Sequence, residues 1–154
     1  MRKQINSIFV YLFFIACWIF FFYFYPYHLH YKEQITLCVL QPDFLQTYLQ
    51  KPAFLTEICG DYLTQFFLWT GGGSSILTLT FVFTWLGLRI ALRKTGITSH
   101  VSLWALLPIV AEWALSCHLE YPLSMSLGLM CSVWAFSLST LSTSTHTRGI
   151  LHVV

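Results

Sequence analysis

The chain has little charge. Only 9% of its 154 residues are Asp, Glu, Lys or Arg, whereas 56% are hydrophobic. A soluble domain carries roughly 25% charged residues, because its surface must be covered with solvated groups. The composition therefore excludes an ordinary soluble domain and indicates a membrane protein. The formal net charge of +2 is too small to suggest a nucleic-acid partner.

Catalytic and redox motifs are also missing. The sequence contains no Gly-rich phosphate loop, no nucleophile elbow and no zinc-protease helix. It has five cysteines but no Cys-x-x-Cys pair, and the odd number argues against a disulfide scaffold. Cys38 and Cys59 share one predicted loop, so they could pair if that loop faces an oxidising compartment. No cofactor and no metal are predicted, and the sequence leaves open whether the protein is an enzyme.

Long apolar runs are what the sequence has instead. The four runs are residues 5–25, 71–92, 97–116 and 123–141. Each is close to the ~20 residues that a helix needs to cross a bilayer. They predict an all-α membrane protein with four transmembrane helices in a single membrane domain, residues 1–154. The first run is too long for a signal-peptide core, which favours an uncleaved anchor. The last run contains five serines, which makes it the least typical span.

Basic residues predict how the chain is threaded. A four-span threading puts six of them on one side: Arg2, Lys3, Arg89, Arg93, Lys94 and Arg148. Lys32 and Lys51 fall on the other side, together with most of the acidic residues. The positive-inside rule then places both termini in the cytoplasm and the protein in the inner (plasma) membrane. A large loop, residues 26–70, and a short turn at 117–122 face outward.

The outer loop has amphipathic patterning. Pro42 and Pro52 stand where helices commonly begin. Apolar pairs then recur every four residues, and the polar or small residues Glu57, Gly60, Asp61 and Thr64 occupy the opposite face. The pattern predicts two surface helices, residues 42–50 and 53–68. They lie either along the outer membrane surface or against the protein's own bundle, since the basic polar face of a lipid-binding helix is missing.

Three segments of this loop carry a resemblance. They are Tyr31-Lys32-Glu33-Gln34, Tyr48-Leu49-Gln50-Lys51-Pro52 and Tyr62-Leu63-Thr64-Gln65-Phe66-Phe67. The chain resembles an uncharacterised family of multi-pass membrane proteins from Bacteroides-type bacteria over about residues 31–75. It departs from that family where Ala53-Phe54 replaces a Gly-Gly pair and where Gly71-Gly72-Gly73 forms the linker. Members of the family are longer, so the resemblance implies a truncated or shortened member, and it implies no activity.

Glu112 is the one carboxylate inside an apolar run. A buried carboxylate must be paired, protonated or close to water. It could handle a proton or a substrate, or it could simply bond to a neighbouring helix. Pro108 stands four residues earlier and removes the hydrogen bond to the carbonyl of Trp104, which predicts a local kink there.

Two further acids are candidates for catalysis. Glu33 and Asp43 follow the first run on the outer side, as outer-loop acids do in multi-pass transferases that act on lipid-linked sugars. The chain resembles those enzymes in architecture only, and solvated loop charges explain the same residues. His28 and His30 provide half a metal site without a clear third ligand, although His118 and Glu120 could approach them if the outer loops converge.

The last run also carries a stripe of small residues. Ser124, Gly128 and Ser132 recur every four residues, a spacing that lets another helix approach closely. The stripe serves packing within the bundle or contact with another membrane helix. Three hypotheses for function follow. They are an uncharacterised multi-pass inner-membrane protein with the lipid bilayer as its partner, a piece of a membrane enzyme for lipid-linked substrates, and a small transporter-like or partner-binding subunit.

Overall fold

The computed structural model describes residues 2–35, 46, 48–97 and 100–141, and these residues form helices and turns with no strand among them. The elements are α1 (Arg2–Ile19), the π-helical turn η1 (Phe20–Phe24), α2 (Pro26–Ile35), α4 (Phe54–Thr64), the 3-10 turn η2 (Gln65–Leu68), α5 (Gly72–Lys94), α6 (Val101–Trp104), α7 (Leu106–Ser116) and α8 (Leu123–Leu141). The predicted all-α class is therefore confirmed.

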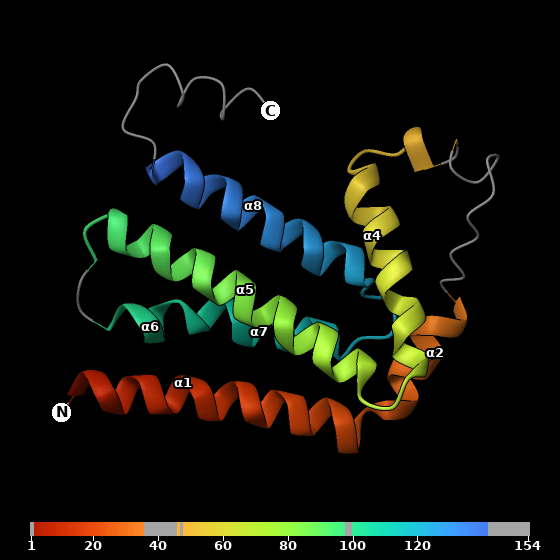
Figure 1. Ribbon diagram of the computed structural model, residues 1–154, viewed down its shortest axis with the longest axis horizontal. Coiled ribbons are helices and arrows are strands. Elements are labelled where there is room, and N and C mark those ends of the chain that lie inside the picture. Colours follow the sequence, from red (N-terminus) through yellow and green to blue (C-terminus); the bar gives the residue numbers. More distant parts are fainter. Residues whose placement is uncertain (1, 36–45, 47, 98–99, 142–154) are drawn as a thin grey trace.

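Four helical segments run side by side in a bundle (Figure 1). They are α1, α5, the broken pair α6 and α7, and α8, and α5 contacts all of the others. The N-terminus, the connection after α5 and the last turn of α8 lie at one end of the bundle. The opposite end is crossed by α2 and α4, and we call it the capped end.

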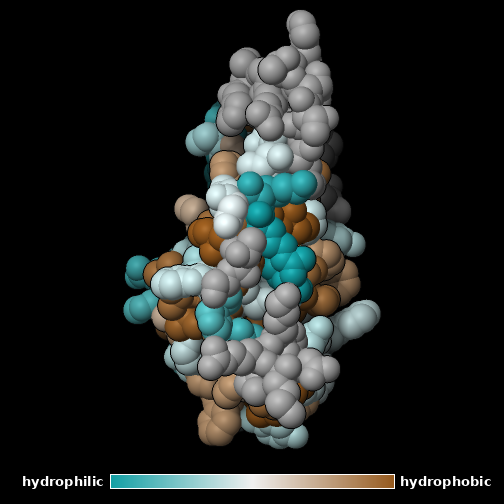
Figure 2. All heavy atoms as spheres, turned by 90° about the vertical axis from the view of Figure 1, so that its left-hand side faces the viewer, coloured by the Kyte–Doolittle hydropathy of each residue, from teal (hydrophilic) through white to brown (hydrophobic). Residues whose placement is uncertain are grey.

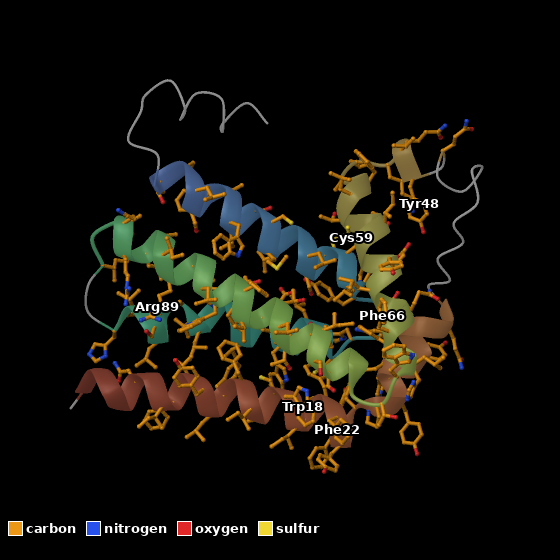
Figure 3. All side chains as sticks on the ribbon, in the orientation of Figure 1. Trp18, Phe22, Tyr48, Cys59, Phe66 and Arg89 are labelled. Atoms are coloured by element: carbon orange, nitrogen blue, oxygen red, sulfur yellow. The ribbon has the colours of Figure 1, made fainter. Side chains whose placement is uncertain are left out.

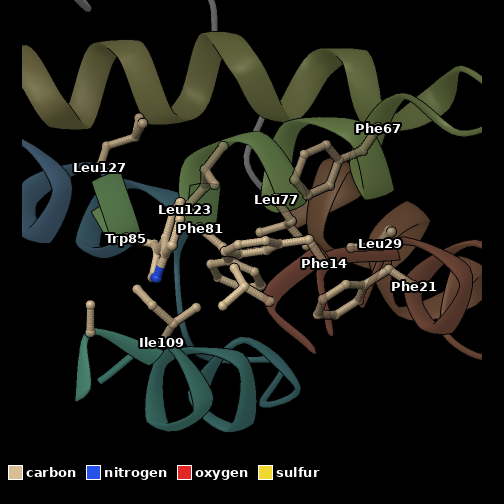
Figure 4. Close-up of a cluster of buried hydrophobic side chains, with 12 residues drawn as sticks. Phe14, Phe21, Leu29, Phe67, Leu77, Phe81, Trp85, Ile109, Leu123 and Leu127 are labelled. Atoms are coloured by element: carbon tan, nitrogen blue, oxygen red, sulfur yellow. The ribbon is translucent and has the colours of Figure 1, made fainter. Parts of the chain in front are cut away.

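An aromatic core holds the bundle together (Figure 4). Leu77, Phe81 and Trp85 recur every four residues on α5, so they share the face that α5 turns toward the other helices. Phe21 of η1 packs on Phe81 with ring centroids 6.2 Å apart. Phe14 of α1 meets Trp85 edge to face, with ring centroids 5.8 Å apart. Such pairs add stability beyond the burial of their area.

Two helices, α5 and the Leu123–Thr140 part of α8, are long and apolar enough to cross a membrane. A third span is possible if the pair Ile8–Phe24 and Pro26–Lys32, which is bent by 78°, counts as one. The predicted span at 97–116 forms a shorter apolar helix, Val101–Ser116. The described residues thus offer two spans, or up to three, where the sequence pattern predicts four.

The third segment is also interrupted. Its helix begins only at Val101 and is interrupted at Ala105, between α6 and α7. The interruption follows Trp104, whose carbonyl cannot accept a hydrogen bond from Pro108 because proline has no N–H, and this is where the sequence predicts a kink. The serine-rich run behaves differently, since α8 is continuous. The run that looks least typical in sequence therefore forms one of the two complete candidate spans.

Within the predicted helix 53–68, α4 is followed by η2. Leu63 and Phe67 of the predicted apolar face contact the core, but part of the polar face is packed as well. Gly60 and Thr64 are buried, whereas Leu55 and Tyr62 are 64% and 50% exposed. The contact is with the first turn of α8, where a Cβ built on Gly60 would lie 2.8 Å from the backbone nitrogen of Ser124. The small side of α4 thus faces α8, because the two backbones can approach closely there. The other predicted helix, 42–50, lies largely outside the described residues.

The small-residue stripe of α8 is used at one end only. Ser124 packs against Gly60, but no atom lies within 4 Å of a Cβ built on Gly128. Ser132 is exposed, and its hydroxyl donates to the carbonyl of Gly128 at 2.8 Å. The close contact between α8 and α5 lies elsewhere, where the Ser137 hydroxyl donates to the carbonyl of Gly87 at 2.7 Å.

Candidate functional site

A cavity of about 390 Å³ opens at the capped end, where α2, α4 and the turn between α7 and α8 meet. Tyr31 and Lys32 come from α2, Asp61 and Thr64 come from α4, and residues 119–123 come from the turn and the start of α8. Three segments that are distant in sequence therefore build one site. Its lining combines charged groups, aromatic rings and apolar side chains.

Lys32 forms a wall of this cavity. Its side chain is only 9% exposed, and its ammonium donates to the carbonyl oxygens of Ser116 at 2.9 Å and Tyr121 at 3.1 Å. Ser116 is the last residue of α7, where carbonyls have no partner within the helix and a positive charge is favoured. Lys32 thereby fixes α2 to the end of α7 and to the turn that follows.

Glu112 lies behind the cavity rather than in its lining. Its side chain is 4% exposed, and its carboxylate Oε1 accepts from the hydroxyls of Tyr121 at 3.0 Å and Ser126 at 2.5 Å. Ser126 belongs to α8, so the carboxylate bonds to a neighbouring helix, as one of the two interpretations from sequence expects. Two hydroxyl donors supply much of what a buried carboxylate loses on leaving water.

Tyr121 joins the two groups. Its carbonyl accepts from Lys32 and its hydroxyl donates to Glu112. Burial, the negative charge of Glu112 and the hydrogen bond to Glu112 together raise the pKa of Tyr121 to about 12, and burial contributes most. The phenol therefore stays a donor at neutral pH. Tyr121 therefore fixes the turn between α7 and α8 by one hydrogen bond to α2 and one to α7.

The carboxylates of the cavity are Asp61 and Glu120. Asp61 is half-buried and accepts from the Tyr48 hydroxyl at 2.5 Å; Figure 3 shows Tyr48 near the N-terminal end of α4. Glu120 is exposed in the turn. Sequence reasoning places Asp61 only on a polar helix face and Glu120 only near histidines. In the structure Gly60, one residue before Asp61, is buried against α8. This contact brings the polar face of α4, with Asp61, to the cavity.

The two outer-loop acids that the sequence offers as catalytic candidates, Glu33 and Asp43, are not tested by the described residues. Glu33 follows Lys32 in α2, but its side chain, like the whole of Asp43, lies outside the described part of the chain. Within that part, no group of three His, Cys, Asp or Glu side chains could hold a metal ion. His28 instead stacks on Tyr25 with ring centroids 4.4 Å apart. Cys59 has a free, exposed thiol, and Cys38, with which it could pair, lies outside the described residues.

Fold and composition define an all-helical protein with two, or up to three, helices that are long and apolar enough to cross a membrane. The chain belongs to the Family of unknown function (DUF6057), whose model matches residues 1–154. Comparison with curated proteins and with solved structures finds no match. An uncharacterised family agrees with the resemblance noted around residues 31–75, and the match extends well beyond that segment.

Proposed function

We propose that the chain is a multi-pass inner-membrane protein whose capped end faces outward and binds a ligand in the 390 Å³ cavity. The exposed surface of α1 supports a lipid environment. Ile8, Phe9, Leu12 and Ile15 are large apolar side chains that are each more than half exposed. A contiguous apolar surface of this kind is unusual in a water-soluble monomer, whereas lipid chains would cover it.

Charge supports the orientation. Arg93 and Lys94 are exposed at the end of α5 that lies away from the capped end, and hydrophilic surface is visible there (Figure 2). Asp61 and Glu120 lie at the capped end. The positive-inside rule puts the first end in the cytoplasm, together with the start of α1 and the last turn of α8.

Exposed aromatic residues support a membrane–water interface at the capped end. Tyr23, Phe24, Tyr27 and Trp69 are strongly exposed around the bend between α1 and α2 and before α5. Trp and Tyr favour the headgroup level of a bilayer. The bend of 78° after Phe24 turns α2 across the bundle at this level, and α4 also crosses it (Figure 1).

The cavity is the observation that carries the binding role. Its volume lies within the roughly 300–1,000 Å³ of small-molecule sites. It opens at the proposed headgroup level and offers both carboxylates and apolar side chains. Its buried polar wall of Lys32 and Tyr121 is hydrogen-bonded and fixed in place, as a preformed site requires.

Cysteine labelling tests the orientation. Gln50 and Thr95 are both exposed, and Cys59 is an exposed free thiol. In a Cys59→Ser background, Gln50→Cys is expected to react with a membrane-impermeant maleimide in intact cells. Thr95→Cys is expected to react only after permeabilisation. The Cys59→Ser protein without a new cysteine gives the background, and the reverse pattern would overturn the orientation.

A membrane enzyme for lipid-linked substrates is the second candidate. Asp61 and Glu120 in one interfacial cavity favour it, because paired acids can serve as base or acid. The two functions differ in whether the bound lipid is chemically changed when it is released. A binding protein returns an added lipid chemically unchanged, whereas an enzyme returns a product whose mass differs, so mass spectrometry of the recovered lipid separates them.

Contact with other membrane helices remains a prediction. Gly128 and Ser132 of α8 are open to such a partner, and Ser124 is already used within the bundle. A partner-binding subunit would use the outer face of α8, away from the cavity. Chemical crosslinking from Ser132→Cys would detect that contact as a second band.

A further inference from the structure

We infer that the cavity binds the primary ammonium headgroup of an amphiphile. This inference rests on the proposed function, since it names the ligand class of the same site. It begins with charge. Among the described residues that line the cavity, Asp61 and Glu120 are acidic and Lys32 is basic, which gives a formal charge of −1. A lining of net negative charge favours a cationic group.

The accessibility of these charges strengthens the argument. Lys32 is almost fully buried, and its ammonium donates to two backbone carbonyls at the end of α7 and in the turn. Its role is therefore to hold the wall. Asp61 is half-buried and Glu120 is exposed. The carboxylates are thus the charges that an entering headgroup meets, and hydrogen bonds from an ammonium to a carboxylate are stronger than those between neutral groups.

Aromatic rings add to the preference for a cation. Tyr31 and Tyr121 both line the cavity, and a ring face attracts an ammonium group within about 6 Å. The hydroxyl of Tyr121 is committed to Glu112, so the ring is what this residue offers to a ligand. Glu112 accepts that hydrogen bond from behind the cavity wall and keeps the ring in place.

Apolar residues decide between a free amine and an amphiphile. Leu119, Pro122 and Leu123 form the side of the cavity that belongs to the turn and to the first residue of α8. Because α8 is a candidate membrane span that begins at Leu123, this side leads toward the acyl chains of a bilayer. A ligand with an ammonium head and an apolar tail satisfies both parts of the lining.

Binding of short-chain lipids tests the inference. The full chain, purified in detergent, is titrated with dioctanoyl phosphatidylethanolamine, its N-acetyl derivative, dioctanoyl phosphatidylglycerol or free ethanolamine, and bound lipid is counted by native mass spectrometry. We expect the affinity for phosphatidylethanolamine to be at least about tenfold higher than that for each of the other compounds. The N-acetyl derivative keeps the tail and the phosphate but loses the ammonium charge, so it isolates the contribution of that charge.

Two variants locate the binding in the cavity. Asp61→Asn and Glu120→Gln keep the side-chain shape but remove the charge, and each is expected to weaken phosphatidylethanolamine binding about tenfold or more, as loss of a charged hydrogen bond does. Glu57→Gln is the matched control. Glu57 lies one turn before Asp61 on α4, pairs with Lys51 at 3.4 Å and does not line the cavity, so this variant should bind normally.

Several outcomes would overturn the ligand class. They are equal binding of the N-acetyl lipid or of phosphatidylglycerol, equal binding of free ethanolamine, and unchanged binding in Glu120→Gln. Glu120 is exposed, so its variant reports on binding even if Asp61→Asn fails to fold. The labelling of Gln50→Cys and Thr95→Cys is read separately in cells. A failed lipid preference with the expected labelling therefore rejects the ligand class and leaves the membrane orientation standing.

Discussion

Replacing Gly60 by alanine tests the contact that places α4 on α8. A Cβ at this position would lie 2.8 Å from the backbone nitrogen and 2.9 Å from the Cα of Ser124. Real Cβ atoms essentially never approach that closely, and a backbone cannot rotate out of the way as a side chain can. The two helices must move apart. Overpacking of this kind costs typically ~1–3 kcal/mol, although alanine gains about 1 kcal/mol over glycine inside a helix.

Gly128→Ala is the control that separates these two effects. Gly128 lies inside α8, and a Cβ built there meets no atom within 4 Å. It carries the same gain in helix propensity but no steric conflict. The difference in free energy of unfolding between Gly60→Ala and Gly128→Ala therefore equals the overpacking cost, ~1–3 kcal/mol. Gly87→Ala should fall between them, because its Cβ would meet a side-chain methyl of Val133 at 2.8 Å, which can shift.

Thermal unfolding in detergent, followed by circular dichroism, measures this order. For a chain of about this size, 1 kcal/mol shifts Tm by roughly 2–4 °C, so the Gly60 and Gly128 variants should differ by roughly 2–12 °C. Gly60→Ala is expected to be the least stable of the three variants. If it unfolds at the same temperature as Gly128→Ala, the close approach of α4 to α8 is refuted, and with it the placement of Asp61 in the cavity.

Two further predictions concern the buried carboxylate and the turn beside it. Glu112→Leu leaves the hydroxyls of Tyr121 and Ser126 without their acceptor. It should lower stability by ~2–6 kcal/mol, since each buried unpaired group costs about 1–3 kcal/mol. Glu112→Gln keeps an acceptor and should lose less, and equal Tm values for the two variants would contradict the hydrogen bonds described. The pKa of Tyr121 is raised to about 12, so its folded state binds the proton more tightly than the unfolded state. The stability it contributes is present below about pH 10 and is lost as pH rises toward 12. Denaturation between pH 9 and pH 12 measures this loss, which should be absent from Tyr121→Phe.

The helical class and the positions of the apolar runs could be predicted because both follow from local composition. Runs of about 20 apolar residues leave a helix as the economical way to satisfy the backbone in lipid, and the observed helices α5 and α8 begin within one residue of the predicted 71–92 and 123–141. The break at Ala105 was also accessible, since Pro108 removes one particular hydrogen bond.

The orientation of α4 could not be predicted from periodicity alone. A hydrophobic pattern identifies two faces but does not say which one meets the bundle when lipid is available to cover the other. In water the face of Leu55 and Tyr62 would have to be buried. In the bilayer environment that we propose, this constraint disappears, and the close approach of the backbones at Gly60 decides the packing instead.

The cavity could not be predicted from the sequence for a related reason. Lys32, Asp61 and Glu120 lie on α2, α4 and a short turn, and no short motif connects them. Their meeting depends on the bend after Phe24 and on the direction in which α4 packs. The sequence does single out Glu112, because a carboxylate in an apolar run is rare. In the structure it does not line the cavity but accepts a hydrogen bond from Tyr121 in the cavity wall.

Some of these residues line the cavity and others hold its wall in place, and this difference determines which variants can report on function. Lys32, Tyr121 and Glu112 hold α2, α7 and α8 together by hydrogen bonds among largely buried groups, so their loss changes folding and binding together. Asp61 and Glu120 line the same cavity with partly exposed side chains. Removing their charge leaves the aromatic core of Phe81 and its neighbours untouched. An effect of these two variants on ligand binding at unchanged stability would therefore come from the site itself, whereas the same effect in Glu112→Leu would carry no such information.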